Sequence, residues 1–336
     1  MSATETQVET KKITIIQAIN EAISEAMAAD PKVIVLGEDV ADREGGGVVG
    51  VTRGLSTKYG DHRVISTPIA EQAIMGAAIG AAVGGYKVVA EIMLMNFTTV
   101  AMDMIVNHAA KLRYMSGGQT HVPITIRTMT GAGIGNGGQH SDYLEAWFAH
   151  TAGIKVIAPS NPADAYGLLR SCIDDPDPCL FIENLPGYWA PGEPPAKGHR
   201  VPLGKAKIVR EGSDVTVISY SRMMVEAINA LKVTDQNGIS VELIDLRSIS
   251  PWDQAAVVNS AAKTGRVLIV HEAVTRFGVG AEIASTLSEA LFGRLKKPVM
   301  RLGAAYSPVP FSKPLEAAHA PNAERIAAAI QALVTG

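Results

Sequence analysis

The hydrophobic positions of this chain form short, continuously apolar runs, separated by longer stretches in which apolar residues recur at helical spacing. Short apolar runs rich in Val and Ile are typical of buried strands in parallel sheets. In the first half of the chain they predict strands at 32–40, 87–93, 123–129, 154–160 and 179–184. The intervening stretches predict helices at about 14–28, 71–85, 98–115, 143–150 and 162–174. This alternation indicates an α/β fold with largely parallel sheets.

The alternation stops at a proline-rich segment and resumes after it. Prolines at positions 186, 191, 194, 195 and 202 stand too close together for a regular helix or strand. Further strands are predicted at 214–221, 240–248, 266–273 and 298–303, with helices at about 222–232, 253–263 and 279–292. We therefore predict two domains, each a largely parallel sheet flanked by helices. The expected boundaries are a flexible tail at 1–12, a first domain at 13–186, a linker at 187–200 and a second domain at 201–336.

Composition and charge exclude several classes of protein. Hydrophobic residues make up 47% of the 336 residues and charged residues 19%, as in an ordinary globular chain. A net charge of −3 offers no basic surface for nucleic acid. The longest apolar stretch, 73–86, is too short to span a bilayer, and the polar N-terminal residues do not resemble a signal peptide. Cys172 and Cys179 fit no zinc motif, so we expect reduced thiols in a cytoplasmic protein without membrane partners.

A glycine-rich segment, GAGIGNGGQHSD, follows the strand at 123–129. Its residues 133–138 satisfy the spacing G-x-G-x-x-G, which cradles a dinucleotide pyrophosphate where a strand meets a helix. The next strand ends in Pro159-Ser160 instead of an acidic residue, and the loop leads to His140 instead of a helix. These departures argue against a nicotinamide or flavin site. Two interpretations remain: a flexible strand-to-helix connection, or a site where a cofactor or substrate approaches the backbone beside His140.

The segment VISTPIAEQAIMGAAIGAAVGG places Glu71 between an apolar strand and a helix without a polar face. A carboxylate in the first turn can simply complement the helix dipole, which contributes some tenths of a kcal/mol. The alternative is functional. Because a helix that is apolar all round is buried, Glu71 would lie at the rim of a deep interface, where a carboxylate shielded from water can share a proton with a heterocycle.

Four stretches of the sequence carry a resemblance to a known family: GEDV, TPIAEQAIMG, NFTTVAMDMIVNHAAKLRYMSGG and GGQHSDYLEAWFAHTAGIKVIAPSNPADAYGLL. In order and spacing they resemble the beta subunit of thiamine-diphosphate-dependent 2-oxo acid dehydrogenases, the decarboxylating first component of those complexes. The resemblance covers nearly the whole chain. GVVGVTRGL and RTMTGAG are most similar to the acetoin dehydrogenase branch. The fold implied is a pyrimidine-binding domain followed by a transketolase C-terminal-type domain.

The resemblance implies roles for residues around the pyrimidine ring of the cofactor. Glu71 matches the glutamate that hydrogen-bonds the aminopyrimidine and favours the tautomer able to remove the thiazolium proton. Phe97 matches the aromatic residue that packs on the pyrimidine face, although core burial alone would also account for it. Ile69 matches a residue beside that ring. Val100 departs from the family, because several members have a polar residue there.

His140 matches the active-site histidine at the mouth of the lipoyl channel in this family. Its implied role is proton transfer during reductive acylation, or orientation of the dithiolane; the alternative is a structural histidine. Asp142 stands where many members have Gln, and it would add negative charge beside the substrate channel. Donor or acceptor preference is therefore expected to differ from that of the common pyruvate enzymes.

A further correspondence concerns a monovalent cation, such as K⁺, that some members bind. Backbone groups of four residues match that loop: Ile124, Cys172, Asp175 and Asp177. The match is loose because the loop sequence varies within the family.

Enzymes that use thiamine diphosphate anchor its diphosphate through Mg²⁺ on a G-D-G motif, which this sequence lacks. The resemblance therefore implies an alpha partner that carries the motif and most of the Mg²⁺ site, in an α₂β₂ tetramer. Gly76-x-x-x-Gly80 suits close helix contact at such an interface. The implied reaction cleaves a C–C bond next to a carbonyl and transfers the acyl unit to a lipoyl-bearing acyltransferase or carrier. The alternatives are ketol transfer from a sugar phosphate to a lipoyl or acyl carrier, and a non-catalytic docking subunit.

Overall fold

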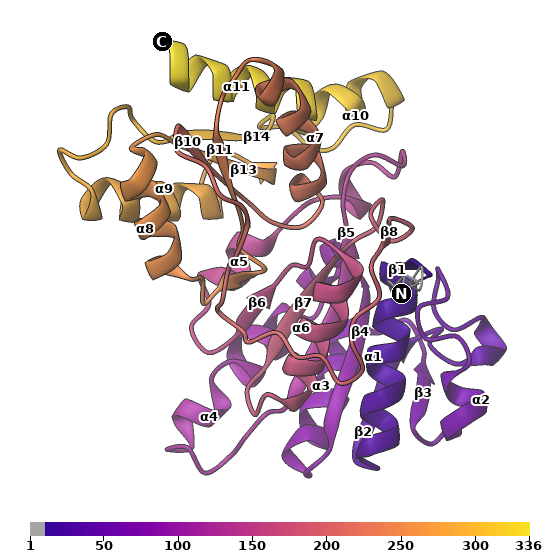
Figure 1. Ribbon diagram of the computed structural model, residues 1–336. Helices are drawn as coiled ribbons and strands as arrows, with labels where there is room; N and C mark the ends of the chain where they lie inside the picture. The colour runs from indigo at the N-terminus through magenta and orange to yellow at the C-terminus, as the bar shows by residue number, and fades with distance from the viewer. Residues whose placement is uncertain (1–10) are drawn as a thin grey trace, which may run out of the picture.

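The computed structural model of the protein describes residues 11–336, and two sheets organise its two halves (Figure 1). Among these residues the first sheet has the strand order β12-β6-β7-β5-β4-β2-β3. Six of its strands come from the first half of the chain and are parallel to one another: β2 (Val33–Glu38), β3 (Val64–Thr67), β4 (Lys87–Leu94), β5 (Ile124–Thr130), β6 (Lys155–Ile157) and β7 (Cys179–Asn184). Residues 1–10 of the predicted tail lie outside the described residues.

The second sheet has the order β14-β13-β10-β11-β9. Its strands are β9 (Lys207–Arg210), β10 (Val215–Ser219), β11 (Val241–Asp245), β13 (Val267–Val274) and β14 (Met300–Ala304). All neighbours are parallel except the edge strand β9, which is antiparallel to β11. The predicted α/β fold, with two largely parallel sheets, is therefore confirmed.

Helices cover both sheets. They are α1 (Ile15–Ala29), α2 (Leu55–Tyr59), α3 (Glu71–Val83), α4 (Leu112–Met115), α5 (Glu145–Ala149), α6 (Pro162–Asp174), α7 (Met223–Gln236), α8 (Gln254–Thr264), α9 (Val279–Ala290), α10 (Lys313–His319) and α11 (Ala323–Thr335). Local sequence explains the starts of α1 and α6. Thr14 and Gln17 form a capping box at α1, and Asn161 caps α6 with a proline following it.

The core of the first half lies on both faces of the first sheet. Alternate β2 residues face opposite layers: Val35 packs in the cluster that contains α1 and α6, whereas Leu36 packs in the cluster that contains α3. The α3 cluster continues into the second half through residues such as Ile218 and Ile244, so one apolar core joins the two halves. In the second half, α7 and α11 form a separate layer on the other face of the sheet.

The structure differs from the predicted elements in several places. The single helix expected at 98–115 is interrupted: a 3₁₀ turn at Met95–Thr99 and a π-helical turn at Met104–Ala109 precede α4. The Thr98 hydroxyl donates to the Met95 carbonyl, which favours a turn over a continuous helix. Three helices, α2, α10 and α11, and the edge strand β9 were not predicted. A second-half strand, β12 (Ser248–Ser250), joins the first sheet antiparallel to β6.

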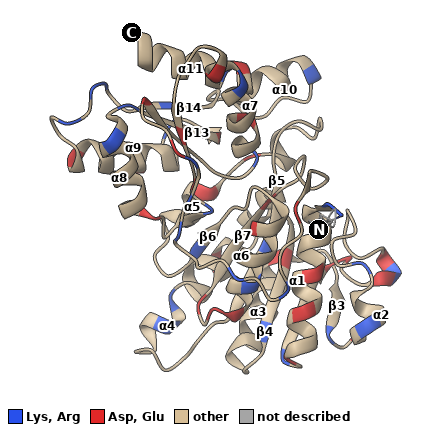
Figure 2. Ribbon diagram, viewed as in Figure 1, with Lys and Arg blue, Asp and Glu red and all other residues tan. Residues whose placement is uncertain are grey.

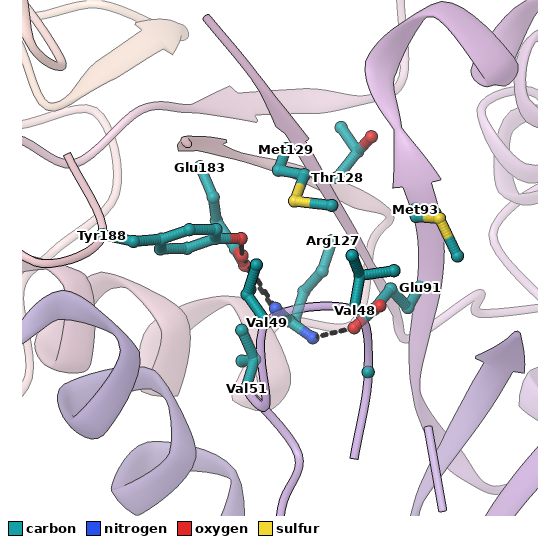
Figure 3. Close-up of a pocket in the computed structure, with 11 residues that line it drawn as sticks. Val48, Val49, Val51, Glu91, Met93, Arg127, Thr128, Met129, Glu183 and Tyr188 are labelled. Carbon is teal, nitrogen blue, oxygen red and sulfur yellow. Dashed lines mark hydrogen bonds and ion pairs between the residues drawn. The ribbon is translucent and has the colours of Figure 1, made fainter. Parts of the chain in front are cut away.

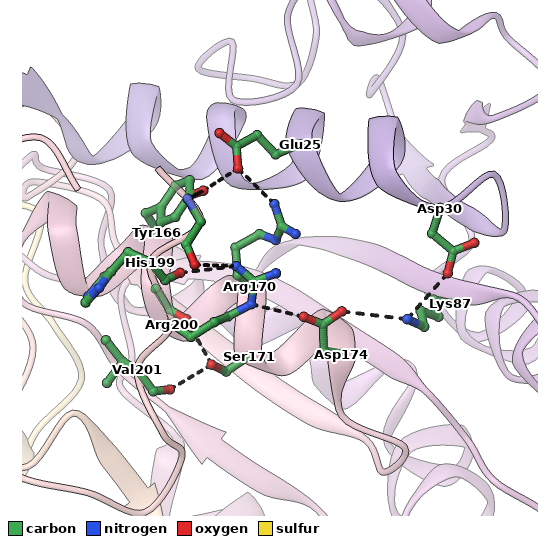
Figure 4. A network of polar contacts seen from close by, with 12 residues as sticks. Glu25, Asp30, Lys87, Tyr166, Arg170, Ser171, Asp174, His199, Arg200 and Val201 are labelled. Atoms are coloured by element: carbon green, nitrogen blue, oxygen red, sulfur yellow. Dashed lines mark hydrogen bonds and ion pairs between the residues drawn. The ribbon is translucent and has the colours of Figure 1, made fainter. Parts of the chain in front are cut away.

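The proline-rich segment runs along the first half of the molecule. Its short strand β8 (Pro191–Gly192) pairs with β1 (Ile13–Thr14). Figure 4 shows the polar network beyond it, in which Asp174 on α6 pairs with Arg200 at 3.0 Å. The Ser171 hydroxyl donates to the Val201 carbonyl at 2.7 Å. The segment at 187–200 is thus hydrogen-bonded to the first half, and its role as a linker stays a prediction.

Basic and acidic residues are interspersed over both halves in Figure 2. Surfaces with mixed charge do not attract polyanions strongly. Within residues 11–336, no helix has the length and apolar character needed to cross a membrane.

Buried polar contacts cross between the two halves. The Tyr220 hydroxyl donates to Glu145 Oε1 at 2.6 Å, and the Ser160 hydroxyl donates to Asp245 Oδ2 at 2.5 Å. Burial raises the pKa of Glu145 to about 7, and burial likewise raises the pKa of Asp245 to about 7. Both carboxyl groups therefore favour the protonated form when the chain is folded.

Replacing Glu145 with Gln is expected to stabilise the protein at alkaline pH. The folded-state pKa of about 7 exceeds the ordinary value of 4.5, so the folded wild type holds an extra proton between them and loses stability as the pH rises through that window. Gln stays neutral and can still accept from Tyr220. The free energy of unfolding of the variant should exceed that of wild type by about 2–3 kcal/mol at pH 8 and match it near pH 4.5.

Thermal unfolding from pH 4.5 to 8 measures this difference. Glu282→Gln, at an exposed position on α9, is the control and should show no such trend. A difference in Tm between Glu145→Gln and wild type that is the same at both ends of the range would contradict the expectation.

Candidate active site

Glu71 is the first residue of α3 and follows β3 at the carboxyl edge of the first sheet. It is 9% exposed, and within residues 11–336 no hydrogen bond or ion pair engages its carboxylate. The nearby Thr67 hydroxyl oxygen is also buried without a partner in the described part of the chain. Ile69, between them, is 75% exposed. Because neither polar group is engaged by the described part of the chain, both remain free to contact a ligand.

The surroundings of Glu71 are acidic. Glu38 lies at the end of the adjacent strand β2, and burial, followed by the charges of Asp39, Glu71 and Glu91, raises the pKa of Glu38. Arg127 Nη1 contacts Glu91 at 2.6 Å, and Arg127 also holds Glu183 through two hydrogen bonds of 2.7 Å. Within residues 11–336, Arg127 forms no ion pair with Glu71.

Figure 3 shows the small pocket above this arginine. Its wall comes from the loop that carries Val48, Val49 and Val51, and Arg127 lies at its base between the two carboxylates. Glu71 does not line it. We assign this cluster a structural role, because its charges are paired with one another.

Phe97 and His140 meet although they come from different loops. Phe97 lies in the 3₁₀ turn after β4, and His140 ends the 3₁₀ turn Gly138–His140 after β5. Their ring centroids are 5.4 Å apart with the planes at 76°. His140 Nδ1 is buried and has no hydrogen-bond partner within residues 11–336. No residue of the described chain engages either ring nitrogen, and because Nδ1 is shielded from solvent, Nε2 is the ring nitrogen that a second substrate can reach.

Asp142 is fixed beside this pair. Asn96 Nδ2 donates to Asp142 Oδ2 at 2.9 Å and to the Gly138 carbonyl at 3.1 Å. The Thr130 hydroxyl donates to the Asp142 backbone carbonyl at 2.7 Å. Asn96 thus links the turn that carries Phe97 to the loop that carries His140. Sequence spacing gave no signal for this role of Asn96.

The glycine-rich loop is bonded to the second half of the chain. The amides of Gly133 and Gly135 donate to the carboxylate of Glu316, and the amide of Ala132 donates to Glu272 Oε1 at 2.7 Å. Arg222 Nη1 donates to the Ala132 carbonyl at 2.6 Å. The amides that would meet a pyrophosphate in a dinucleotide-binding loop are thus occupied by the chain's own carboxylates. One of the two sequence-based interpretations was a flexible strand-to-helix connection. The loop instead is hydrogen-bonded to the second half of the chain.

The residues expected near a monovalent cation lie in one region. The Asp175 amide donates to the Cys172 carbonyl at 3.2 Å, and Lys155 Nζ pairs with Asp175 Oδ1 at 2.6 Å. Arg113 Nη1 pairs with Asp177 Oδ1 at 2.6 Å. The side chains of Asp175 and Asp177 are therefore already paired with Lys155 and Arg113. The predicted ligands of the cation are backbone groups, which these ion pairs do not involve. The cation site, including the contribution of Ile124, stays a prediction.

Comparison with known proteins assigns the two halves. Residues 11–187 match the family described as "Transketolase, pyrimidine binding domain", and residues 204–326 match "Transketolase, C-terminal domain". A solved structure entitled "Split gene transketolase, inactive beta4 tetramer" has a TM-score of 0.77 and 22% identity, covering 97% of this chain and 99% of that one. At this identity the likeness establishes the fold alone.

Relatives with higher identity are beta subunits. The acetoin:2,6-dichlorophenolindophenol oxidoreductase subunit beta of Cupriavidus necator is 42% identical over 97% of this chain and 98% of its own length. The pyruvate dehydrogenase E1 component subunit beta-2, mitochondrial, of rice (Oryza sativa subsp. japonica) is 43% identical over 94% and 85%. The 2-oxoisovalerate dehydrogenase subunit beta of Chaetomium thermophilum is 46% identical over 90% and 65%.

These relatives favour the dehydrogenase interpretation over ketol transfer from a sugar phosphate and over a docking subunit. They also agree with the resemblance found in the sequence segments around Glu71, Phe97 and His140. The chain therefore belongs to the family of beta subunits that form the first component of thiamine-diphosphate-dependent 2-oxo acid and acetoin dehydrogenases.

Proposed function

We propose that this chain is the beta half of an enzyme that cleaves the C–C bond next to the carbonyl of a 2-oxo acid or acetoin and passes the acyl unit to a lipoyl carrier. The observation that carries the proposal is the buried, unpaired Glu71 carboxylate at the carboxyl edge of the first sheet. A carboxylate in this state is suited to exchange a proton with a bound heterocycle.

The residues at this edge fit the pyrimidine end of thiamine diphosphate. Glu71 would hydrogen-bond a ring nitrogen, Phe97 would pack on the ring face, and the exposed Ile69 would contact its other side. When bound, the cofactor supplies an acidic carbon that becomes a nucleophile toward carbonyl groups. Glu71 would exchange a proton with the ring nitrogen that it hydrogen-bonds, and the buried face of α3 excludes water behind it.

The diphosphate end requires another chain. We propose an alpha subunit that supplies the G-D-G motif and holds Mg²⁺, within an α₂β₂ tetramer. The surface beside Glu71 suits such a partner, because Ile69 and Val100 are exposed apolar side chains. On α3, Ala73, Ala77 and Gly80 are also exposed, and an apolar helix with small exposed residues allows close packing.

His140 and Asp142 are proposed to face the second substrate, the lipoyl group. His140 offers Nε2, the ring nitrogen that is not buried, for proton transfer to the dithiolane, while Asp142 places a carboxylate beside the entrance. We also propose that the backbone groups of Ile124, Cys172, Asp175 and Asp177 can hold K⁺, as in the family pattern. Removal of K⁺ by dialysis, followed by thermal unfolding, tests that site.

The donor substrate is tested with the reconstituted enzyme. The chain is co-expressed with its cognate alpha subunit, and the purified complex is assayed with pyruvate, branched-chain 2-oxo acids, acetoin and ketose phosphates. Acyl transfer to a lipoyl domain with one of the first three supports the proposal. Activity with ketose phosphates alone, or with none of these donors, would overturn it.

Replacing His140 with Ala is expected to impair the lipoyl step selectively. Acyl transfer to a lipoyl domain should fall about 10²-fold, because a positioned proton donor is lost. Reduction of 2,6-dichlorophenolindophenol, which does not need the dithiolane, should fall at least tenfold less. His150→Ala is the control, since His150 is exposed and follows α5. Equal losses with both acceptors would contradict the proposed role of His140.

A further inference from the structure

The loop between β5 and His140 is positioned from the second half of the chain. It receives contacts from three separate elements there: Arg222 at the start of α7, Glu272 on β13 and Glu316 on α10. Phe311, just before α10, packs so closely on Gly137 that a Cβ atom at Gly137 would lie 2.4 Å from the Phe311 ring. The location of the loop is therefore determined largely outside its own domain.

Glu316 makes the most specific of these contacts. Its Oε1 accepts from Gly133 N at 2.6 Å and from Gly135 N at 3.2 Å, and its Oε2 accepts from Gly135 N at 3.0 Å. Both glycines have positive φ, +123° and +78°, which turns their amides toward one concave side. Such a backbone nest binds anions. Here the anion is a side chain of the same protein.

The hydrogen bonds between Glu316 and the two glycine amides matter for stability because the Glu316 carboxylate is buried. Glu316 is 4% exposed, and within residues 11–336 no cationic side chain pairs with it. A buried carboxylate without partners is costly, so the two amides offset its desolvation. Loss of either partner leaves the other unsatisfied. The carboxylate and the loop conformation therefore stabilise each other.

The same contacts extend to His140. Beyond Gly137 the chain enters the turn Gly138–His140. Pro308 packs on this turn: a Cβ atom added to Gly138 would lie 3.3 Å from the Cβ atom of Pro308. His319, at the end of α10, is buried near Asp142; burial lowers the pKa of His319, and the charge of Asp142 acts in the opposite direction. The segment containing α10 thus contacts the His140 loop at both ends.

We propose that Glu316 is a positioning residue for the acyl-transfer step, holding the glycine-rich loop so that His140 meets the lipoyl group. The proposal rests on the proposed function of His140. Because a displacement of about 1 Å at a reacting group can cost about 10²-fold in rate, loosening the loop should affect the step that uses His140 most.

The test compares two acceptors in the reconstituted α/β complex. Glu316→Ala removes both acceptor oxygens, whereas Glu316→Gln keeps the size and one of them. Lipoyl-domain acylation should fall about tenfold more than 2,6-dichlorophenolindophenol reduction in Glu316→Ala, with a smaller difference in Glu316→Gln. Glu324→Gln, at an exposed position in the first turn of α11, is the matched control and should leave the ratio unchanged. A ratio equal to wild type in both Glu316 variants would overturn the proposal.

A second measurement separates this proposal from the proposed function. Hydrogen exchange of the full-length chain reports on the amides of Gly133 and Gly135, which should exchange at least tenfold faster in Glu316→Gln than in wild type. Unchanged protection there would overturn the proposal whatever the activity. Wild-type enzyme that is inactive with every donor would refute the proposed function. Hydrogen exchange at the two glycine amides would then still show whether Glu316 holds the loop.

Discussion

Replacing Glu71 with Gln in the reconstituted α/β enzyme is expected to lower turnover by about 10²–10⁴-fold. The carboxylate is buried and unpaired, so its loss removes the group that exchanges a proton with the pyrimidine ring. Gln occupies the same volume and preserves the first turn of α3. The measurement is single-turnover kinetics at saturating thiamine diphosphate, together with exchange of the thiazolium C2 proton in deuterated water, followed by NMR.

The matched control is Glu21→Gln, at an exposed position on α1. It should leave both rates within about twofold, since surface substitutions away from a site have small effects. Proton exchange in Glu71→Gln as fast as in wild type would refute the assignment of Glu71. It would favour the simpler interpretation, in which this carboxylate only complements the helix dipole.

Replacing Arg127 with Met is expected to lower the free energy of unfolding by about 3–5 kcal/mol. Arg127 is buried and holds Glu91 and Glu183, which are 8% and 1% exposed (Figure 3). The Tyr188 hydroxyl also donates to Glu183, so the cluster is fully connected. Without the arginine, two buried carboxylates lose their cation. Urea denaturation of the full chain, monitored by circular dichroism, measures the change.

Two further variants identify the cause of that loss. Arg210→Met removes the cation of a surface pair with Asp235 and should cost less than about 1 kcal/mol. Changing Glu91 and Glu183 to Gln in the Arg127→Met background removes the uncompensated charges and should restore part of the stability. A cost for Arg127→Met no larger than that for Arg210→Met would show that the ion cluster does not stabilise the fold.

Much of the fold was predictable because local signals agreed with the final structure. The apolar runs became the strands of the two parallel sheets, and Asp253 caps α8, at the start of the helix predicted for 253–263. The breaks in the helix expected at 98–115 were not predictable from the sequence. The apolar pattern runs on without interruption, whereas in the structure hydrogen bonds of the 3₁₀ and π type interrupt the helix. The helix α11 has an ordinary start signal in its sequence, with Asn322 as the cap and an amphipathic segment after it, although it was not among the predicted helices.

The site divides in the same way. Glu71 and His140 could be proposed as site residues from short segments, because each lies where a strand meets a turn or helix, and their roles stay predictions. Their neighbours were not: Glu316 reaches Gly133 across 183 positions of the chain, and Asn96 reaches Asp142 across 46. No spacing rule covers such contacts, because the first is set by the packing of the two domains and the second by the packing of two loops within the first domain. The glycine-rich loop shows the consequence, since its motif suggests a phosphate and its structure holds a glutamate.

The central claim is that this chain supplies one half of a cofactor site that an alpha subunit completes. Calorimetric titration of thiamine diphosphate with Mg²⁺ into the beta chain, the cognate alpha subunit and the assembled complex tests it most directly. We expect tight binding to the complex, and binding at least about 100-fold weaker to the beta chain by itself, a difference of about 2.7 kcal/mol in free energy. Equally tight binding by the isolated beta chain would contradict it.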